Sequence, residues 1–299
     1  MRNNQSPLQG LWLPLVTPFR DGMLDEASLS RLVAHYAGEP IDGLILAATT
    51  GEELGLEEEE IERLVAIATE TLAAAGLSLP IYLGLSGSDT RKLIKALDRT
   101  ADWPIDGHLI SCPCYTRPSQ EGMFQHFTAL AASTDRPIII YNIPYRTGVN
   151  LNAETTLRLA EHANIVGLKD CAVDPAQSFD LLRFRPPGFS VLTGEDAGYY
   201  NALALGADGG ITASAHVAPR AFAGIRDKLL AGDQAGALAD WRFVADLPRL
   251  LFAEPSPAPI KHWLWRVGLI DSPELRLPMT PVTDALAARI DLEIERRRG

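Results

Sequence analysis

Three features are scarce in this 299-residue sequence, and each scarcity excludes a class of protein. No apolar run approaches the roughly 18 residues that a membrane-spanning helix requires, so no membrane partner is predicted. Lysine and arginine number 27 against 38 aspartate and glutamate residues, and the net charge of −11 argues against nucleic acid as a partner. The three cysteines are few and odd in number, as is typical of a reducing compartment, and we expect a cytoplasmic protein.

The length allows either two domains or one large α/β barrel. Residues 1–10 form a polar tail without the apolar stretch of a signal peptide. We divide the remainder into a barrel over 11–231 and a helical region over 232–299, on the pattern described next.

Strand-like and helix-like segments alternate eight times along residues 11–231. The strand-like runs are 11–19, 43–48, 80–85, 107–112, 137–143, 165–170, 189–194 and 209–212. The helix-like segments are 25–37, 57–75, 90–100, 120–132, 153–162, 176–183, 197–205 and 218–231. Eight such units predict a parallel sheet closed into a (β/α)8 TIM barrel. A doubly wound sheet is the alternative, but no glycine-rich dinucleotide fingerprint follows the first strand.

The last part of the chain has a different character. Residues 236–252, 260–267 and 282–298 have helical periodicity, and the segment E-P-S-P-A-P at 254–259 interrupts it. We expect a helical appendage that packs on the barrel and does not form an independent domain.

One predicted strand contains a lysine. Residues 165–170 read I-V-G-L-K-D, an apolar run typical of a strand that is covered on both faces, except for Lys169. Alternation places Ile165, Gly167 and Lys169 on one face, where Gly167 would leave empty volume beside the amine. Burial lowers the pKa of a lysine from its usual value of about 10.4, and a neutral amine attacks carbonyls. The alternative is a strand-end lysine that reaches water or pairs with Asp170.

In barrel enzymes the chemistry lies where strands run into the following loops, so polar residues at the strand ends are the candidates. They are Thr49, Thr50, Glu52, Cys112, Cys114, Tyr115, Tyr141, Asn142, Arg146, Lys169, Gly194, Glu195 and Asp196. A trio of His108, Cys112 and Cys114 could be proposed as metal ligands. Because the two cysteines only flank a proline at a strand end, we predict no metal site.

Lysine, tyrosine, threonine and arginine without a metal are the groups that imine chemistry uses. Lys169 would attack the ketone of a 2-oxo acid and form a covalent imine, with no cofactor. Tyr141 would carry protons, because its usual pKa of about 10 suits exchange with an amine. The turn 49–51 offers hydroxyl and N–H groups to a carboxylate, and the planar fork of Arg146 suits a second anionic group.

Each residue also has a purely structural interpretation. Tyr141 could be a core aromatic with a satisfied hydroxyl, Thr49 and Thr50 could only cap a turn, and Arg146 could belong to a surface ion pair. The combination favours chemistry, because four separate strand ends then converge on one reaction.

Four motifs together indicate a family: T-T-G-E at 49–52, Y-x-R-P-S-Q-E-G at 115–122, Y-N-I-P at 141–144 and G-L-K-D at 167–170. From about Leu11 to Lys261 the chain resembles the pyruvate-dependent Schiff-base aldolases grouped as the dihydrodipicolinate synthase and N-acetylneuraminate lyase family. The resemblance implies that Lys169 is the Schiff-base lysine and Tyr141 the proton-transfer tyrosine.

The resemblance also implies the remaining roles in catalysis and binding. Thr49 would relay protons to Tyr115, which in the family reaches into the site of the neighbouring subunit, so a homotetramer of two tight dimers, or a homodimer, is expected. Thr50 and its turn neighbour Gly51 would hold the pyruvate carboxylate. The carbonyl of Ile211 and the backbone near Gly194 would line the same pocket.

Arg146 discriminates within the family. The synthase branch has an arginine there for the carboxylate of aspartate semialdehyde, so the resemblance implies condensation of pyruvate with this aldehyde, a step of lysine and diaminopimelate biosynthesis. The alternatives are a related aldolase or lyase acting on a 2-keto-3-deoxy sugar acid, N-acetylneuraminate or hydroxy-oxoglutarate, and a catalytically idle barrel that binds a ligand.

Some positions depart from the family pattern. Ala48 and Glu53 replace the Gly and Ser that flank T-T-G-E, and Cys114 replaces the first residue of a Tyr-Tyr pair. The positions of the lysine-inhibition site of bacterial synthases would be Ser88, Lys92 and Cys114, with Glu58 and Ile61 nearby. A cationic side chain at Lys92 indicates that lysine does not inhibit this protein. We expect His216 to be structural and not catalytic.

Overall fold

Eight parallel strands close into a barrel in the computed structural model, which describes residues 8–172 and 174–298. Around the barrel each strand is hydrogen-bonded to the next in the order β1, β4, β5, β6, β7, β8, β9, β10 and back to β1. Their bounds are Gly10–Pro14, Gly43–Leu46, Ile81–Leu85, Gly107–Ser111, Ile138–Asn142, Ile165–Asp170, Ser190–Thr193 and Gly209–Ile211. The predicted barrel is confirmed; residues 1–7 of the predicted tail and residue 299 lie outside the described residues.

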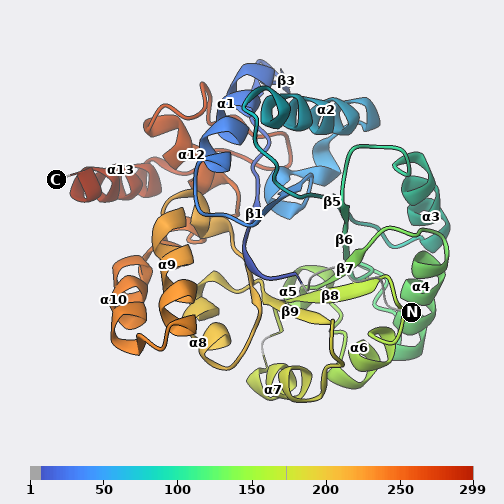
Figure 1. Ribbon diagram of the computed structural model, residues 1–299. Coiled ribbons are helices and arrows are strands. Elements are labelled where there is room, and N and C mark those ends of the chain that lie inside the picture. The colour runs from blue at the N-terminus through green and yellow to red at the C-terminus, as the bar shows by residue number, and fades with distance from the viewer. Residues whose placement is uncertain (1–7, 173, 299) are drawn as a thin grey trace.

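Helices follow the barrel strands and form a ring outside them (Figure 1). They are α1 (Glu26–Ala37), α2 (Glu58–Ala74), α3 (Thr90–Arg99), α4 (Gln120–Ala132), α6 (Ala153–Leu159), α7 (Pro175–Phe184), α8 (Tyr199–Ala204) and α9 (Pro219–Leu230). The starts of α1 and α4 are capped by Asp25 and Ser119, whose side chains accept hydrogen bonds from the N–H groups of Ser28 and Gly122. Among the described residues, no helix is long and apolar enough to cross a membrane.

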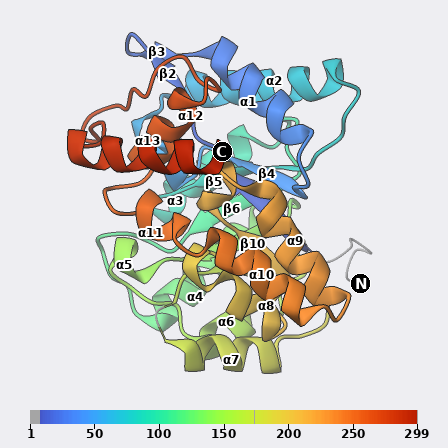
Figure 2. The same cartoon turned by 90° about the vertical axis from the view of Figure 1, so that its left-hand side faces the viewer.

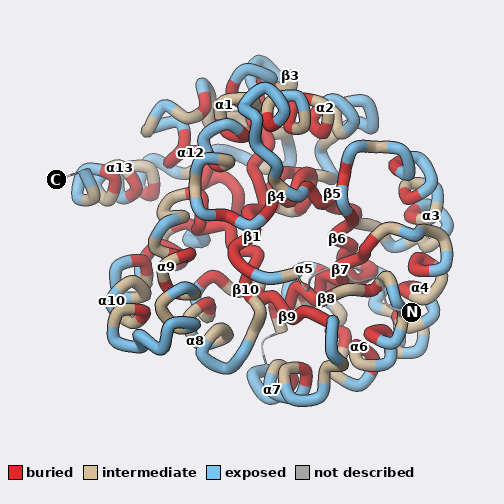
Figure 3. The backbone as a smooth tube through the Cα atoms, viewed as in Figure 1, coloured by how far each residue is buried: buried red, intermediate tan, exposed pale blue. Residues whose placement is uncertain are grey.

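The core has an inner and an outer layer, because successive side chains of a strand point to opposite faces of the barrel wall. The outer layer lies between strands and helices, and the strands are the most deeply buried part of the chain (Figure 3). The inner layer fills the barrel and consists of Trp12, Ile45, Ala48, Tyr82, Leu109, Ile139, Tyr141, Ile143, Cys171, Leu192 and Ile211. A closed apolar interior of this kind removes water from any group that projects into it.

A repeated Asp-Gly pair marks the start of three barrel strands. Asp42, Asp106 and Asp208 each precede a glycine that opens β4, β6 or β10. Each carboxylate accepts a hydrogen bond of 2.8 Å from a backbone N–H at or near the start of the preceding barrel strand, namely from Leu11, Ile81 and Val191. The three carboxylates thereby tie neighbouring strands together at the amino end of the barrel, opposite the end where the loops of the site lie.

The C-terminal region forms four helices on one flank of the barrel, α10 (Gln234–Val244), α11 (Leu247–Leu251), α12 (Ala258–Arg266) and α13 (Asp284–Arg298). Figure 2 shows α13 running across this flank, and α12 packs on α13 and on the 3-10 turn Ala213–His216 that follows β10. The predicted single helix over 236–252 is wrong, because Pro248 sits in the first turn of a new helix that begins at Leu247.

Two further expectations need correction at the start of the chain. The predicted strand over 11–19 is shorter, since β1 ends at Pro14 and the chain then turns into a small hairpin of β2 (Phe19–Arg20) and β3 (Met23–Leu24), which was not predicted. Proline has no N–H for the ladder, which is consistent with a strand that ends at Pro14.

Three buried histidines make the stability of the fold sensitive to acid. Burial lowers the pKa of His108, His126 and His216 to about 4, whereas an unfolded histidine titrates near 6.5. Between these values the unfolded chain binds more protons than the folded chain. The stability that these residues contribute is therefore present above about pH 6.5 and is lost as the pH falls towards 4.

His126→Gln should accordingly flatten the dependence of the unfolding free energy on pH between about 4 and 6.5, by up to about 1.4 kcal/mol per pH unit. Urea denaturation at several pH values measures this slope. His35→Gln, on the exposed side of α1, is the matched control, because it leaves the three buried rings in place. An unchanged slope in His126→Gln would show that the pKa of His126 is the same in the folded and the unfolded chain.

Candidate active site

The lysine of β8 projects into the interior of the barrel. Lys169 is 5% exposed, and burial is the main reason that its pKa is lowered from the usual value. Asp170 points the other way, where its carboxylate accepts hydrogen bonds from the Ala172 N–H (3.0 Å) and the Ser178 hydroxyl (2.6 Å). The alternatives of a solvated lysine or a Lys169–Asp170 pair are thereby excluded.

The space that the Lys169 side chain occupies is not beside Gly167, as we expected from the sequence. A Cβ on Gly167 would lie 2.8 Å from the carbonyl oxygen of Ser190 on β9, so neighbouring backbone already fills that space. A Cβ on Gly194 would lie 2.7 Å from Cε of Lys169 and 2.3 Å from Sγ of Cys171. Gly194, at the end of β9, is therefore the residue whose missing side chain admits the amine.

The predicted face of β8 is also wrong at its first residue. Ile165 packs in the outer layer, and Val166 packs against the inner one. The cause is a register shift in the β7–β8 pairing, where Ile138 pairs with Ile165 but the next residue, Ile139, pairs with Gly167. Beyond this irregularity Lys169 and Cys171 share the inner face, as alternation requires.

Tyr141 lies beside the lysine because β7 and β8 are neighbours in the barrel. The two residues are directly paired in the ladder, and Nζ of Lys169 is 4.0 Å from the centroid of the tyrosine ring. Burial raises the pKa of Tyr141 well above its usual value, and the side chain of Thr49 hydrogen-bonds it. Three predicted residues, from the turn after β4 and from β7 and β8, are thus brought together, and the tyrosine hydroxyl is protonated.

Acidic side chains and a thiol complete the surroundings of the amine. Glu195 and Asp196 follow β9 and act on Lys169 to raise its pKa, against the larger effect of burial. Asp196 is held by the N–H groups of Ala213 (3.3 Å) and Ser214 (2.5 Å). Burial raises the pKa of Glu195, whose carboxylate is hydrogen-bonded by the side chain of Cys171. Cys171 was missed from the sequence, although its position two residues after Lys169, directly beyond the end of β8, was a usable signal.

The turn predicted to receive a carboxylate is a 3-10 turn, Thr49–Gly51, at the end of β4. Thr50 is 7% exposed, and the carbonyl of Gly51 accepts a hydrogen bond of 2.7 Å from the hydroxyl of Thr17. Ile211 is the last residue of β10 and packs in the inner layer. The residues predicted to line the pocket therefore all lie at the same rim of the barrel.

Two predicted residues lie further out. Arg146 is exposed on the short helix α5 (Pro144–Thr147), yet its charge lowers the pKa of both Lys169 and Tyr141. Tyr115 is 93% exposed, with a left-handed backbone (φ +65°), and its side chain does not join the other catalytic candidates within one chain.

The proposed metal trio is not assembled in the fold. His108 faces the helices, where Nε2 lies 2.9 Å from the Thr100 hydroxyl, and Cys112 is buried in the same outer layer. Cys114 lies on the loop after β6, where its Sγ is 3.4 Å from the Ser88 hydroxyl. His216 is also held as a structural residue, with Nδ1 at 2.8 Å from the carbonyl of Ala213 and Nε2 accepting from the Val16 N–H (3.3 Å). Within residues 8–172 and 174–298, no three His, Cys, Asp or Glu side chains could hold a metal ion.

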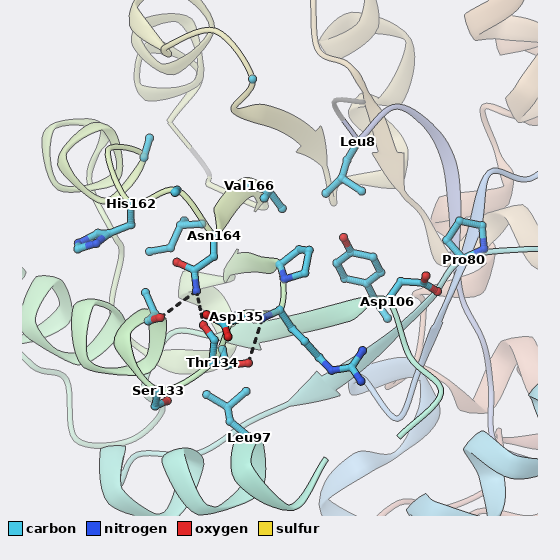
Figure 4. A pocket seen from close by; sticks show the side chains of 18 of the residues that line it. Leu8, Pro80, Leu97, Asp106, Ser133, Thr134, Asp135, His162, Asn164 and Val166 are labelled. Atoms are coloured by element: carbon cyan, nitrogen blue, oxygen red, sulfur yellow. Dashed lines mark hydrogen bonds between the residues drawn. The ribbon is translucent and has the colours of Figure 1, made fainter. Parts of the chain in front are cut away.

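A cavity of about 1380 Å³ lies at the other end of the barrel, where the strands begin (Figure 4). Asp106, Asn164 and Val166 are among the residues around it, and none of the predicted catalytic or binding residues lines it. The amide of Asn164 donates hydrogen bonds to the carbonyls of Ala131 and Thr134, so the polar groups here tie loops together.

A family model described as the dihydrodipicolinate synthetase family matches residues 7–295. This chain belongs to that family. A protein of Clostridium acetobutylicum named 4-hydroxy-tetrahydrodipicolinate synthase 2 is 43% identical over 284 residues, which are 95% of this chain and 98% of that protein.

Solved structures of the family have the same fold. Dihydrodipicolinate synthase from Thermotoga maritima superposes with a TM-score of 0.93 at 30% identity, covering 97% of this chain and 99% of that one. The chloride-inhibited enzyme from Acinetobacter baumannii, complexed with pyruvate, gives 0.90 at 34% identity, covering 96% and 98%.

The departures from the family pattern lie on the loops around the site. The carboxylate of Glu53 accepts a hydrogen bond of 2.6 Å from the N–H of Ser86, and burial raises the pKa of this acid. The hydroxyl of Ser88 donates to the carbonyl of Cys114 (2.5 Å). Glu53 and Cys114 therefore join the loops after β4, β5 and β6 to one another at the mouth of the barrel.

Proposed function

We propose that this protein condenses pyruvate with L-aspartate 4-semialdehyde to give 4-hydroxy-tetrahydrodipicolinate, through an imine on Lys169. The observation that carries the proposal is the enclosed amine of Lys169 beside Tyr141, which Thr49 hydrogen-bonds. Membership of the family and the names of its curated relatives support the same reaction.

In the first half of the reaction, the amine of Lys169 attacks the ketone carbon of pyruvate. The carbinolamine loses water to give an iminium ion, with Tyr141 and Thr49 carrying the protons. Thr50 and Gly51 hold the pyruvate carboxylate through hydroxyl and backbone N–H groups, beside the carbonyl of Ile211 and the backbone of Gly194. No metal or other cofactor is needed, since the iminium itself draws electrons from carbon three.

In the second half, carbon three loses a proton and the resulting enamine attacks the aldehyde carbon. The amino group of the semialdehyde moiety then attacks the iminium carbon; this new carbon–nitrogen bond closes the six-membered ring of the product, and the bond to Lys169 breaks, which restores the amine. The aldehyde partner carries a carboxylate, and Arg146 is the cation at the mouth of the barrel whose charge is felt at both Lys169 and Tyr141. This favours aspartate semialdehyde over the sugar acids of related lyases.

We also propose that lysine does not inhibit this enzyme. Lys92 places a cationic, exposed side chain on α3, Glu58 is paired with Arg99, and Ser88 is bonded to Cys114. An assay with added lysine measures this directly. The three free cysteines support a reducing compartment and hence the cytoplasm, which cell fractionation measures.

Reduction with borohydride in the presence of pyruvate tests the imine. The wild-type protein should gain one pyruvate-derived adduct on Lys169, detected by mass spectrometry, because borohydride fixes the carbon–nitrogen double bond. Lys169→Arg should gain none, whereas Lys92→Arg, which changes an exposed lysine, should behave as the wild type. A barrel without this chemistry would gain no adduct at all.

Arg146→Ala should lower kcat/KM for aspartate semialdehyde by about 10- to 100-fold, because a charge-assisted contact contributes roughly 1.5–3 kcal/mol. The KM for pyruvate should change little. Arg146→Lys should be intermediate, since it retains the charge and loses the fork. Equal rates in Arg146→Ala and the wild type would remove the support for this aldehyde and favour a sugar-acid substrate.

We further propose a homodimer or homotetramer in which Tyr115 completes the proton path in the partner subunit. Tyr115 and Leu54 are 93% and 82% exposed at the mouth of the barrel, an unusual state for large apolar side chains. Tyr115→Phe should therefore lower kcat while sedimentation shows an unchanged assembly. A protein that is monomeric and fully active would contradict this arrangement.

A further inference from the structure

A second lysine is buried more completely than the catalytic one. Lys261 on α12 is 0% exposed, and its Nζ forms an ion pair with Glu52 and donates to the carbonyl of Glu274 (2.8 Å). Burial lowers the pKa of Lys261 to about 8, while Glu52 acts to raise it. The amine therefore still carries its proton near neutral pH, inside a part of the protein that water does not reach.

Glu52 is the residue that ends the turn Thr49–Gly51. Its backbone is left-handed, with φ +56° and ψ 37°, a conformation that is strained for a residue other than glycine. Its N–H donates to the carbonyl of Thr49 (3.2 Å), and its carboxylate accepts from the N–H of Arg276 (3.2 Å) as well as pairing with Lys261. The side chain of Glu52 thus holds the backbone in a conformation that the turn requires.

The pair is embedded in cationic and acidic groups of the C-terminal region. Nζ of Lys261 and the guanidinium of Arg276 each lie 4.3 Å from the ring centroid of Phe19, on the hairpin after β1. Arg276 in turn forms two hydrogen bonds with the carboxylate of Glu60 on α2 (2.5 and 2.6 Å). The groups that face Lys261 are therefore Glu52, Glu274, Arg276 and Phe19, contributed by three different parts of the chain.

A continuous series of contacts leads from this pair to the reacting amine. Lys261 contacts Glu52, Glu52 ends the turn that carries Thr49, and Thr49 hydrogen-bonds Tyr141 beside Lys169. Stability alone does not account for such a pair, since replacing a buried ion pair by neutral side chains of similar volume is often neutral or stabilising.

We propose that Lys261 and Glu52 are a positioning pair, which holds the Thr49–Gly51 turn in the orientation that receives the pyruvate carboxylate and directs Thr49 towards Tyr141. The C-terminal helical region is on this view a supporting part of the active site. The inference rests on the proposed function, because the turn is given a role only by the binding of pyruvate.

The test compares single and double variants by the pyruvate concentration needed for half-maximal borohydride adduct on Lys169. Glu52→Gln and Lys261→Met should each raise this concentration about tenfold or more, because the turn loses its fixed orientation. Each single variant also leaves a buried charge unpaired and should lower Tm. The double variant Glu52→Gln/Lys261→Met removes both charges, so its Tm should recover towards the wild-type value while the half-saturating concentration stays raised.

Asp291→Asn is the matched control. Asp291 pairs with His262 and Arg266, which lie on the same helix as Lys261, and it makes no contact with the turn, so pyruvate saturation should be that of the wild type. A double variant that recovers both Tm and pyruvate saturation would overturn the inference, because the pair would then be only structural. A wild-type protein without any adduct would instead overturn the proposed function.

Discussion

The enclosure of one amine in an apolar barrel is the constraint on which the site depends. An ammonium group loses its hydration there, so burial favours the neutral and nucleophilic form of Lys169. Glu195 and Asp196 act in the opposite direction and Arg146 in the same one, so the acidity of the amine is a balance set by groups on the loops after β7 and β9. A change in any of these loops alters the reactivity of Lys169 without touching it.

The architecture supplies this enclosure in a simple way. Parallel strands bring their carboxyl ends to one rim, so residues far apart in the chain meet there. The pairing of β7 with β8 places Tyr141 against Lys169, and β9 contributes Gly194, which leaves the space that the lysine fills. At the other rim, the carboxylates of Asp42, Asp106 and Asp208 hydrogen-bond the starts of neighbouring strands. The candidate site thus lies at one end of the barrel, and these stabilising contacts lie at the other.

The C-terminal helices extend the support of the site beyond the barrel. Through Lys261 on α12 and Arg276 in the segment between α12 and α13, the C-terminal region contacts the turn after β4 and the hairpin after β1. The turn is consequently held from two sides, by Thr17 at Gly51 and by the C-terminal region at Glu52. A segment that the sequence marks only as a helical appendage therefore contacts the turn that we propose to bind the pyruvate carboxylate.

Much of this molecule could be predicted from the sequence, because local patterns carry the information. Eight alternations of apolar runs and helical periods define the barrel, and a lysine in the apolar run 165–170 indicates the residue that we propose to react. The exact ends of helices and strands were harder to predict from the sequence, because they depend on the hydrogen bonds that form in the assembled sheet and helices. The end of β1 at Pro14 and the break before Leu247 are examples.

The sequence by itself determined which residue types lie at the strand ends, and hence the class of chemistry. Only the tertiary structure decided that Gly194, and not Gly167, makes room for the amine, and that Ile165 faces outward. Only it joined Cys171 to Glu195 and Lys261 to Glu52. The physical reason is that the register between strands and the contacts between distant segments arise only when the whole chain packs. The alternation of residues along a single strand carries no information about either.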